Sequence, residues 1–220
     1  MAIRVNFEQE LESLKQNLEE MGRKIESIFD KLYLAIEDRN EESIKEIISS
    51  DSSVNDMEKN IEAKCLSLIT RQQPVAKDLR LVSASLKVVT DLERTADHAA
   101  DIAELVLRIL PEDVMAISNH LQPMMEATIK MVHNAVDAFA SRDEISARAV
   151  ISYDDVIDNY FNLVKDEIVV LLKKEEVNPD VCIDVLMIAK YLERVGDHGV
   201  TIADWEIFQE TGTMNHVRLL

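Results

Sequence analysis

Apolar residues recur at steps of three and four positions along every long segment of the chain, with polar residues between them. In the first segment these apolar positions are Phe7, Leu11, Leu14, Leu18, Met21, Ile25, Ile28, Leu32 and Ile36. Such a stripe covers about a third of a helix surface, which is typical of a helix with one face against a core. The pattern therefore predicts an all-α fold built from long amphipathic helices.

The stripes are interrupted where Ser, Asp, Asn and Pro gather, because these residues cap new helices or end old ones. The interruptions lie at residues 39–40, 49–53, 73–74, 111, 141–143, 152–154 and 178–180. They predict three long helices before Pro111 and three after it, with Pro123 in a first helical turn or at a bend. Only four glycines and four prolines are present, too few for the many tight turns of a β-rich fold.

The two halves of the chain resemble each other in sequence. The run Leu-Glu-Arg-Thr-Ala-Asp-His at 92–98 matches Leu-Glu-Arg-Val-Gly-Asp-His at 192–198, an offset of 100. The preceding helical region matches at an offset of 103, with residues 39–51 on residues 142–154. The predicted fold class is therefore all-α, with two tandem, pseudo-symmetric three-helix bundles. We assign residues 1–110 to the first bundle and 111–220 to the second.

Composition excludes several classes of protein. The hydrophobic content of 47% is too high for a disordered chain, and the formal net charge of −18 disfavours nucleic acid and anionic lipid as partners. The longest apolar run found spans five residues, Ile168–Leu172, whereas a membrane span needs about 20. Cys65 and Cys182 lie far apart at apolar positions, so they predict core thiols and no zinc ribbon. We expect a soluble, intracellular chain without a direct membrane span.

Part of the negative charge follows the helical period. At 100° per residue, Glu93, Asp97, Asp101 and Glu104 share one stripe beside the apolar face, and residues 51–62 carry a second stripe. Like charges four residues apart cost about 0.2–0.5 kcal/mol per pair in an isolated helix, so a bound cation would offset a real penalty. Carboxylate oxygens suit Mg²⁺, Ca²⁺, Mn²⁺ or iron. The candidate metal ligands are Glu93, Asp97, Asp101, Glu193, Asp197, Asp51, Asp154 and Asp158.

Alternatives stay open for both the acids and the histidines. The acids could be no more than the solvated faces of acidic helices. His98 and His198 lie about 140° around the helix from their glutamates, so each either caps a cluster from a neighbouring helix or makes a structural hydrogen bond. A ferritin-like di-iron site needs Glu-x-x-His, but the residue three after Glu93 is Ala96, so a di-iron oxidase site is not supported. No activated nucleophile, P-loop or dinucleotide motif is found, so no catalytic residue is predicted.

The run at residues 71–80, Arg-Gln-Gln-Pro-Val-Ala-Lys-Asp-Leu-Arg, is followed by Asp91-Leu92-Glu93-Arg94 and Asp97-His98-Ala99. These segments closely resemble the PhoU family, the phosphate-specific transport system accessory proteins, and the resemblance covers nearly the whole chain. It implies two three-helix bundles and a cytoplasmic homodimer that reaches the inner face of the membrane through its partners. It also implies a negative regulator of phosphate uptake and phosphate-starvation signalling, acting on the ATPase subunit of an ABC phosphate transporter and on a sensor histidine kinase.

Some members of the family bind iron or zinc clusters through these motifs, which implies roles here for Glu93, Asp97, Glu193 and Asp197. The family usually has Asn four residues after the motif Asp, but this chain has Asp101 in the first half and Thr201 in the second. Tyr191 replaces the acid that corresponds to Asp91. We therefore expect tighter cation binding in the first bundle, with iron, zinc, magnesium or manganese as candidate ions.

The leading hypothesis is a non-enzymatic regulator with acidic, metal-competent helix faces. The alternative is a metal-storage or metal-dependent helical-bundle protein that uses the same carboxylate clusters. A third possibility is a purely structural helical adaptor, in which the carboxylates have no role in signalling.

Overall fold

The computed structural model describes residues 2–110, 112, 114–174, 177–214 and 217–218, and these residues are almost entirely helical. The long helices are α1 (Ala2–Glu37), α2 (Glu41–Gln72), α3 (Lys77–Arg108), α5 (Leu121–Ser141), α6 (Glu144–Lys174) and α7 (Pro179–Thr211). A single turn, α4 (Val114–Ile117), precedes α5. After α7, β1 (Thr213–Met214) pairs antiparallel with β2 (Val217–Arg218). The helical pattern did not predict α4 or this short hairpin.

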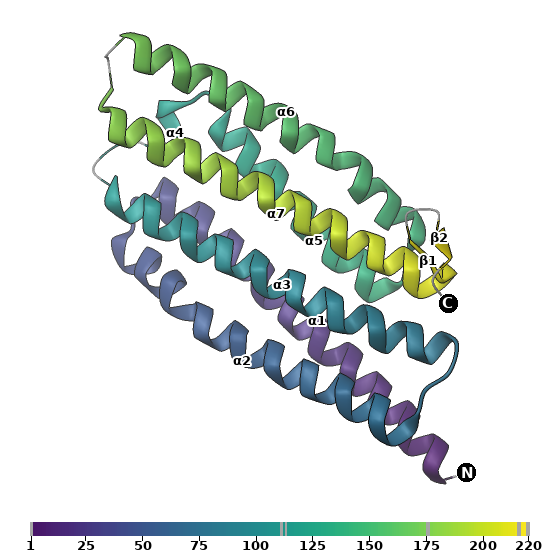
Figure 1. Ribbon diagram of the computed structural model, residues 1–220. Helices are drawn as coiled ribbons and strands as arrows, with labels where there is room; N and C mark the ends of the chain where they lie inside the picture. Colours follow the sequence, from purple (N-terminus) through teal and green to yellow (C-terminus); the bar gives the residue numbers. More distant parts are fainter. Residues whose placement is uncertain (1, 111, 113, 175–176, 215–216, 219–220) are drawn as a thin grey trace.

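The six long helices form two three-helix bundles, as predicted from the sequence. In Figure 1, α6, α7, α3 and α2 lie side by side in one layer, and α1 and α5 lie behind them. The bundles meet where α3 packs against α7 and α1 packs against α5. The division into residues 1–110 and 111–220 stays a prediction. None of the described helices has an apolar stretch long enough to cross a membrane.

The sequence repeat is also visible in the backbone at the turn before the second helix of each bundle. Arg39 and Arg142, which correspond at an offset of 103, both have left-handed backbones, with φ of 51° and 57°. The next helix then begins with a cap: the Asn40 side chain accepts from the Ser43 amide, and Asp143 accepts from the amides of the residues at 145 and 146. The left-handed conformation costs a non-glycine residue about 1 kcal/mol. Because arginine adopts the left-handed conformation at both turns, neither turn uses a glycine.

The breaks predicted at residues 49–53 and 152–154 are wrong, because α2 and α6 run through them. The serine hydroxyls are satisfied within the helix: Ser50 donates to the carbonyl of Ile47 at 2.7 Å, and Ser53 donates to that of Ser50 at 2.6 Å. Ser152 donates to the carbonyl of Arg148 at 3.1 Å. Serine can therefore remain in a helix when its hydroxyl bonds back to the preceding turn. Pro123 lies in the first turn of α5, one of its two expected positions.

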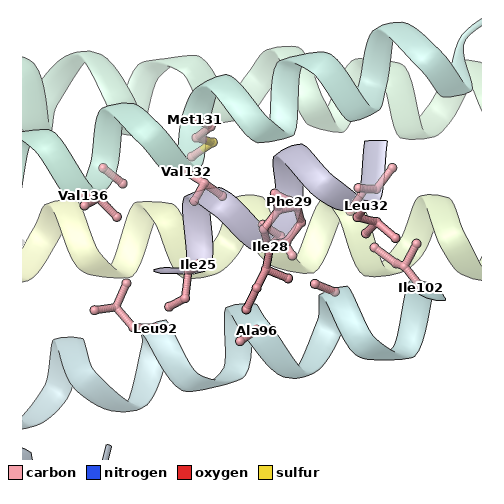
Figure 2. Close-up of a cluster of buried hydrophobic side chains, with 14 of the residues drawn as sticks. Ile25, Ile28, Phe29, Leu32, Leu92, Ala96, Ile102, Met131, Val132 and Val136 are labelled. Carbon is pink, nitrogen blue, oxygen red and sulfur yellow. The ribbon is translucent and has the colours of Figure 1, made fainter. Parts of the chain in front are cut away.

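The core extends through both bundles. Figure 2 shows Ile25, Ile28, Phe29 and Leu32 of α1 beside side chains of α3 and α5, with Met131, Val132 and Val136 contributed by α5. At Gly22 a Cβ atom would lie 2.5 Å from Cγ1 of Val136, so glycine is needed for the close approach of α1 to α5. Cys65 and Cys182 are buried free thiols, as predicted. Because α1 contacts α5, the two bundles share apolar contacts and are not separate units on a linker.

One buried carboxyl group lies near the end of α7. Glu206 and Gln209 are 0% and 1% exposed, and the Gln209 amide donates to Glu206 Oε2 at 2.6 Å. Arg80 of α3 holds the same turn by donating from Nε to the Gln209 carbonyl at 3.2 Å. Burial, reinforced by the charge of Glu210, raises the pKa of Glu206 to about 8. At neutral pH the folded chain therefore holds a proton on Glu206 that an exposed glutamate, with a pKa near 4.5, has already released.

Substitution Glu206→Gln tests this assignment. Because the pKa of Glu206 rises from 4.5 to about 8 on folding, stability is fullest below pH 4.5 and falls as the pH rises through this window. Glutamine cannot ionise, so we expect its free energy of unfolding to exceed that of the wild type by about 4 kcal/mol at pH 8. Urea denaturation at pH 5 and pH 8 measures both values. Equal effects at the two pH values, or the same behaviour in the exposed control Glu104→Gln, would contradict the assignment.

Candidate metal-binding faces

The first acidic cluster lies where α2 packs against α3. It comprises Asp51, Glu58, Glu62, Glu93 and Asp97. The carboxyl groups of Asp97 and Asp51 share a hydrogen bond, and the Asn55 amide donates to Asp51 Oδ2 at 3.1 Å. The structure thus brings three predicted ligands, Asp51, Glu93 and Asp97, into one group across two helices.

Glu58 and Glu62 join this first cluster although they were not among the predicted ligands. Both are coupled electrostatically to the motif of α3: the charge of Glu62 raises the pKa of Glu93, and the charge of Glu93 raises the pKa of Glu58. The sequence did carry the signal, because these two residues follow Asp51 at helical spacing along the same stripe of α2. Only the packing of α2 on α3 reveals that they face the motif of the neighbouring helix.

Burial and the neighbouring negative charges raise the pKa values of carboxyl groups in the first cluster. The pKa of Asp97 is raised to about 7, first by burial and then by the hydrogen bond to Asp51 and the charges of Glu93, Asp51 and Asp101. Burial also raises the pKa values of Glu93 and Glu58. At neutral pH the carboxyl group of Asp97 is therefore partly protonated, and a cation would displace this proton on binding.

Asp101 is oriented differently from the other predicted ligands of the first bundle. Its Oδ2 lies 3.4 Å from Nδ1 of His98, on the next turn of α3, and its carboxylate is 43% exposed. Its charge still reaches Asp97, whose pKa it helps to raise. Asp101 therefore lies at the edge of the first cluster, where its position as a ligand stays a prediction.

The second acidic cluster lies at the corresponding position between α6 and α7. It comprises Asp154, Asp158, Glu193 and Asp197. Burial and the charges of the other three raise the pKa of Asp154 to about 6. A Cβ atom at Gly196 would lie 3.0 Å from Asp154 Oδ1, so the glycine leaves room for this carboxylate against α7. Glu193 is already paired with Lys190, whose Nζ lies 2.5 Å from its Oε2.

The donor atoms of both clusters are oxygens, which fit magnesium, manganese or iron better than a zinc ion that favours nitrogen and sulfur. In the first cluster, Oδ1 of Asp51 and Oδ1 of Asn55 are buried acceptors without a hydrogen-bond partner. Among the described residues, however, no group of three or more His, Cys, Asp or Glu side chains is arranged to hold a metal ion. The carboxylates would therefore have to close around a cation, and metal binding stays a prediction.

The two motif histidines meet at the centre of the α3–α7 interface. Nδ1 of His198 lies 2.9 Å from Oδ1 of Asp91, and both side chains are almost fully buried. The rings of His98 and His198 stack with centroids 5.5 Å apart, and His98 also lies 5.3 Å from the ring of Tyr191. Burial lowers the pKa of His98. Of the two alternatives for these histidines, this arrangement favours the structural one, in which they join the bundles.

The replacement of an acid by Tyr191 is explained by this interface. Asp91 and Tyr191 correspond at an offset of 100, yet Asp91 binds His198 while Tyr191 packs against His98. One motif histidine therefore has a carboxylate partner from the opposite bundle and the other has an aromatic partner. The sequence comparison detected the substitution but not the histidine that each residue faces.

Removing the carboxylate at position 91 tests the role of this pair. We expect Asp91→Ala to lower the free energy of unfolding at pH 7 by about 1–3 kcal/mol, because buried His198 loses its partner. Chemical denaturation followed by circular dichroism gives the value, with the exposed Asp56→Ala on α2 as control. A loss no greater than that of the control would rule out a structural role for the pair.

Comparison with known proteins places this arrangement in a family. A family model described as PhoU domain matches residues 18–106 and 121–205. The chain is 33% identical over 207 residues to a phosphate-specific transport system accessory protein PhoU homolog from Clostridium acetobutylicum, and the match covers 94% of each chain. It is 30% identical over 213 residues to PhoU homolog 1 from Thermotoga maritima, covering 96% of this chain and 92% of that one.

Solved structures agree with this match. The crystal structure of the phosphate transport system regulatory protein PhoU from Streptococcus pneumoniae superposes with a TM-score of 0.87 at 28% identity, covering 96% of this chain and 100% of that chain. That of PhoU from Pseudomonas aeruginosa gives a TM-score of 0.87 at 30% identity, covering 94% and 100%. Together with the paired motifs at residues 92–98 and 192–198, these matches show that the chain belongs to the PhoU family.

Proposed function

We propose that this protein is an accessory regulator of a phosphate-specific transport system, acting by contact and not by catalysis. It damps phosphate uptake and phosphate-starvation signalling when phosphate is plentiful. Its partners are the ATPase subunit of an ABC phosphate transporter, a sensor histidine kinase and a second copy of the chain. The names of the relatives, which describe phosphate-specific transport system accessory proteins, support this role.

The repeated acidic clusters are the observation on which the mechanism of this proposal depends. Each cluster groups carboxylates from two neighbouring helices, and burial together with the neighbouring negative charges raises the pKa values of Asp97 and Asp154 to about 7 and about 6. A bound cation replaces protons and neutralises part of one helix face. Because charge complementarity governs which surfaces associate, the loaded and unloaded faces differ in their attraction for a partner. Cation occupancy is thus the proposed means by which these faces regulate contact.

A deletion strain tests the regulatory role. With an alkaline phosphatase reporter of phosphate starvation, we expect deletion to raise expression at high phosphate and the wild-type gene to restore repression. Glu93→Gln with Asp97→Asn should restore it incompletely, and the exposed Glu104→Gln should restore it fully. A reporter that stays repressed in the deletion strain would refute the proposed function. Full restoration by the double variant would instead refute a role for the cluster and favour a purely structural adaptor.

The pH dependence of cation binding tests the cluster directly. Because the pKa of Asp97 is about 7, the carboxylate is mostly protonated at pH 6 and mostly ionised at pH 8. We therefore expect the affinity for Mn²⁺, measured by calorimetry, to rise about tenfold between these pH values. Asp97→Asn should weaken binding and remove most of this dependence, while Glu104→Gln should keep both.

An affinity for Mn²⁺ that is unchanged between pH 6 and pH 8 would contradict the participation of Asp97. The stoichiometry separates regulation from storage, because regulation at two clusters predicts a small number of ions per chain. Binding of many ions per chain would favour the metal-storage alternative.

A further inference from the structure

The second acidic cluster contains a basic side chain. Nζ of Lys190 lies 2.5 Å from Oε2 of Glu193, which is three residues further along α7. The same Nζ lies over the Phe161 ring of α6, 5.3 Å from the ring centre. The side chain of Glu193 is only 16% exposed, so water screens this ion pair incompletely. One carboxylate of the cluster is therefore already balanced by a positive charge of the protein, beside the contact between α6 and α7.

The corresponding place in the first acidic cluster has different chemistry. At the offset of 100, Lys190 corresponds to Thr90, which has no charge. At the offset of 103, Phe161 corresponds to Glu58, which is a member of the first cluster. Where the second bundle has an ammonium group beside an aromatic ring, the first bundle therefore has a hydroxyl group and a carboxylate.

The contrast extends over eight corresponding positions of the two helix pairs. The first bundle has six carboxylates and no basic residue at these positions, whereas the second has four carboxylates and two lysines. The positions are 51, 55, 58, 62, 90, 93, 97 and 101 in the first bundle, and 154, 158, 161, 165, 190, 193, 197 and 201 in the second. Because the helices continue through all of them, the difference arises from the side chains and not from the backbone.

Two further basic positions lie near the first cluster without removing this contrast. Arg94 and Arg194 correspond at the offset of 100, so both bundles have an arginine there. Lys59 of α2 is exposed, and it lowers the pKa of Glu58 less than the neighbouring carboxylates raise it. The excess of negative charge in the first cluster therefore remains.

The ion pair limits what the second cluster can bind. A divalent ion there would have to displace the ammonium group of Lys190 from Glu193 or bind beside it, and like charges repel each other. If Glu193 keeps its partner, three carboxylates remain for the ion, those of Asp154, Asp158 and Asp197. Magnesium and calcium take about six or more oxygen ligands. The donor set therefore does not fit the metal ion that the family resemblance implies at Glu193 and Asp197.

The buried acceptors of the two clusters differ in the same direction. In the first cluster, Oδ1 of Asp51 and Oδ1 of Asn55 are buried without a hydrogen-bond partner. Within the described part of the chain, no carboxylate oxygen of the second cluster is buried in this way. A buried acceptor without a partner is costly, so a cation that contacts it relieves a penalty. This penalty exists in the first cluster only.

We propose that the ammonium group of Lys190 takes the place of a bound metal ion in the second acidic cluster. The first cluster alone then exchanges a cation with solution, while the second keeps a constant charge. The proposal rests on the proposed function and narrows it, because it assigns cation-dependent regulation to the α2–α3 face. The two similar bundles thereby present one variable face and one constant face.

Mn²⁺ binding by a chain without a working first cluster tests the proposal. The background is Glu93→Gln with Asp97→Asn, and calorimetry on the full chain measures binding. We expect the background to bind Mn²⁺ weakly and added Lys190→Thr to tighten binding at least about tenfold, since the competing charge is removed. Further addition of Asp154→Asn should abolish this gain.

The matched control is Lys165→Thr in the same background, which removes an equal charge from the neighbouring helix. Nζ of Lys165 lies 6.0 Å from the centre of the same Phe161 ring, but it donates to Oδ1 of Asn162 at 2.7 Å and not to a carboxylate. We therefore expect this change to leave Mn²⁺ binding unchanged.

A reciprocal change keeps the proposal testable if Lys190→Thr loses structure. In the wild-type chain, Thr90→Lys places an ammonium group three residues before Glu93, and we expect it to weaken Mn²⁺ binding at least about tenfold. Thr90→Met adds a side chain of similar length without the charge and should leave the affinity unchanged.

The outcomes separate this proposal from the proposed function. Tight Mn²⁺ binding by the Glu93→Gln, Asp97→Asn background that Asp154→Asn abolishes would overturn the proposal, because the second cluster would then bind a cation beside Lys190. No gain with Lys190→Thr, or an equal gain with Lys165→Thr, would overturn it as well. A wild-type chain that binds no Mn²⁺, together with a gain in the Lys190→Thr variant, would support the role of Lys190 and refute the cation step of the proposed function.

Discussion

The packing of α3 against α7 is the constraint on which the rest of the molecule depends. These helices carry the repeated motifs, and each also forms one wall of an acidic cluster with its own neighbour, α2 or α6. The buried His198–Asp91 pair and the stacked histidine rings lie at their contact. Because a buried charge is costly without a partner, this contact requires one relative position of the two helices. Since each cluster is built on one of these two helices, the contact also determines how the two clusters lie relative to each other.

Much of this arrangement could be predicted from the sequence. The three- and four-residue apolar spacing identifies the long helices, and the repeat identifies the two bundles. The helical wheel also places Glu93 and Asp97 on one stripe beside the apolar face of their helix. These features are encoded locally, since each depends on residues within one or two helices.

The remaining features depend on contacts between distant segments or on the exact path of a side chain. Whether a serine run ends a helix depends on hydroxyls bonding to the preceding turn, as at Ser50 and Ser53. The burial of Glu206 appears only when the helices are packed. The contact between the rings of His98 and Tyr191 likewise depends on how α3 and α7 are aligned along each other. Spacing along one helix contains none of this information.

The turns at Arg39 and Arg142 have a mechanical consequence. A non-glycine residue has fewer accessible backbone conformations than glycine, so the turns at Arg39 and Arg142 are less flexible than glycine turns would be. Hinge motion usually needs a few residues that absorb large changes of φ and ψ, whereas packed helices move by small sliding displacements. A cation that draws the carboxylates of one cluster together would therefore shift whole helices along one another. These turns therefore favour small sliding movements of the packed helices over hinge opening between them.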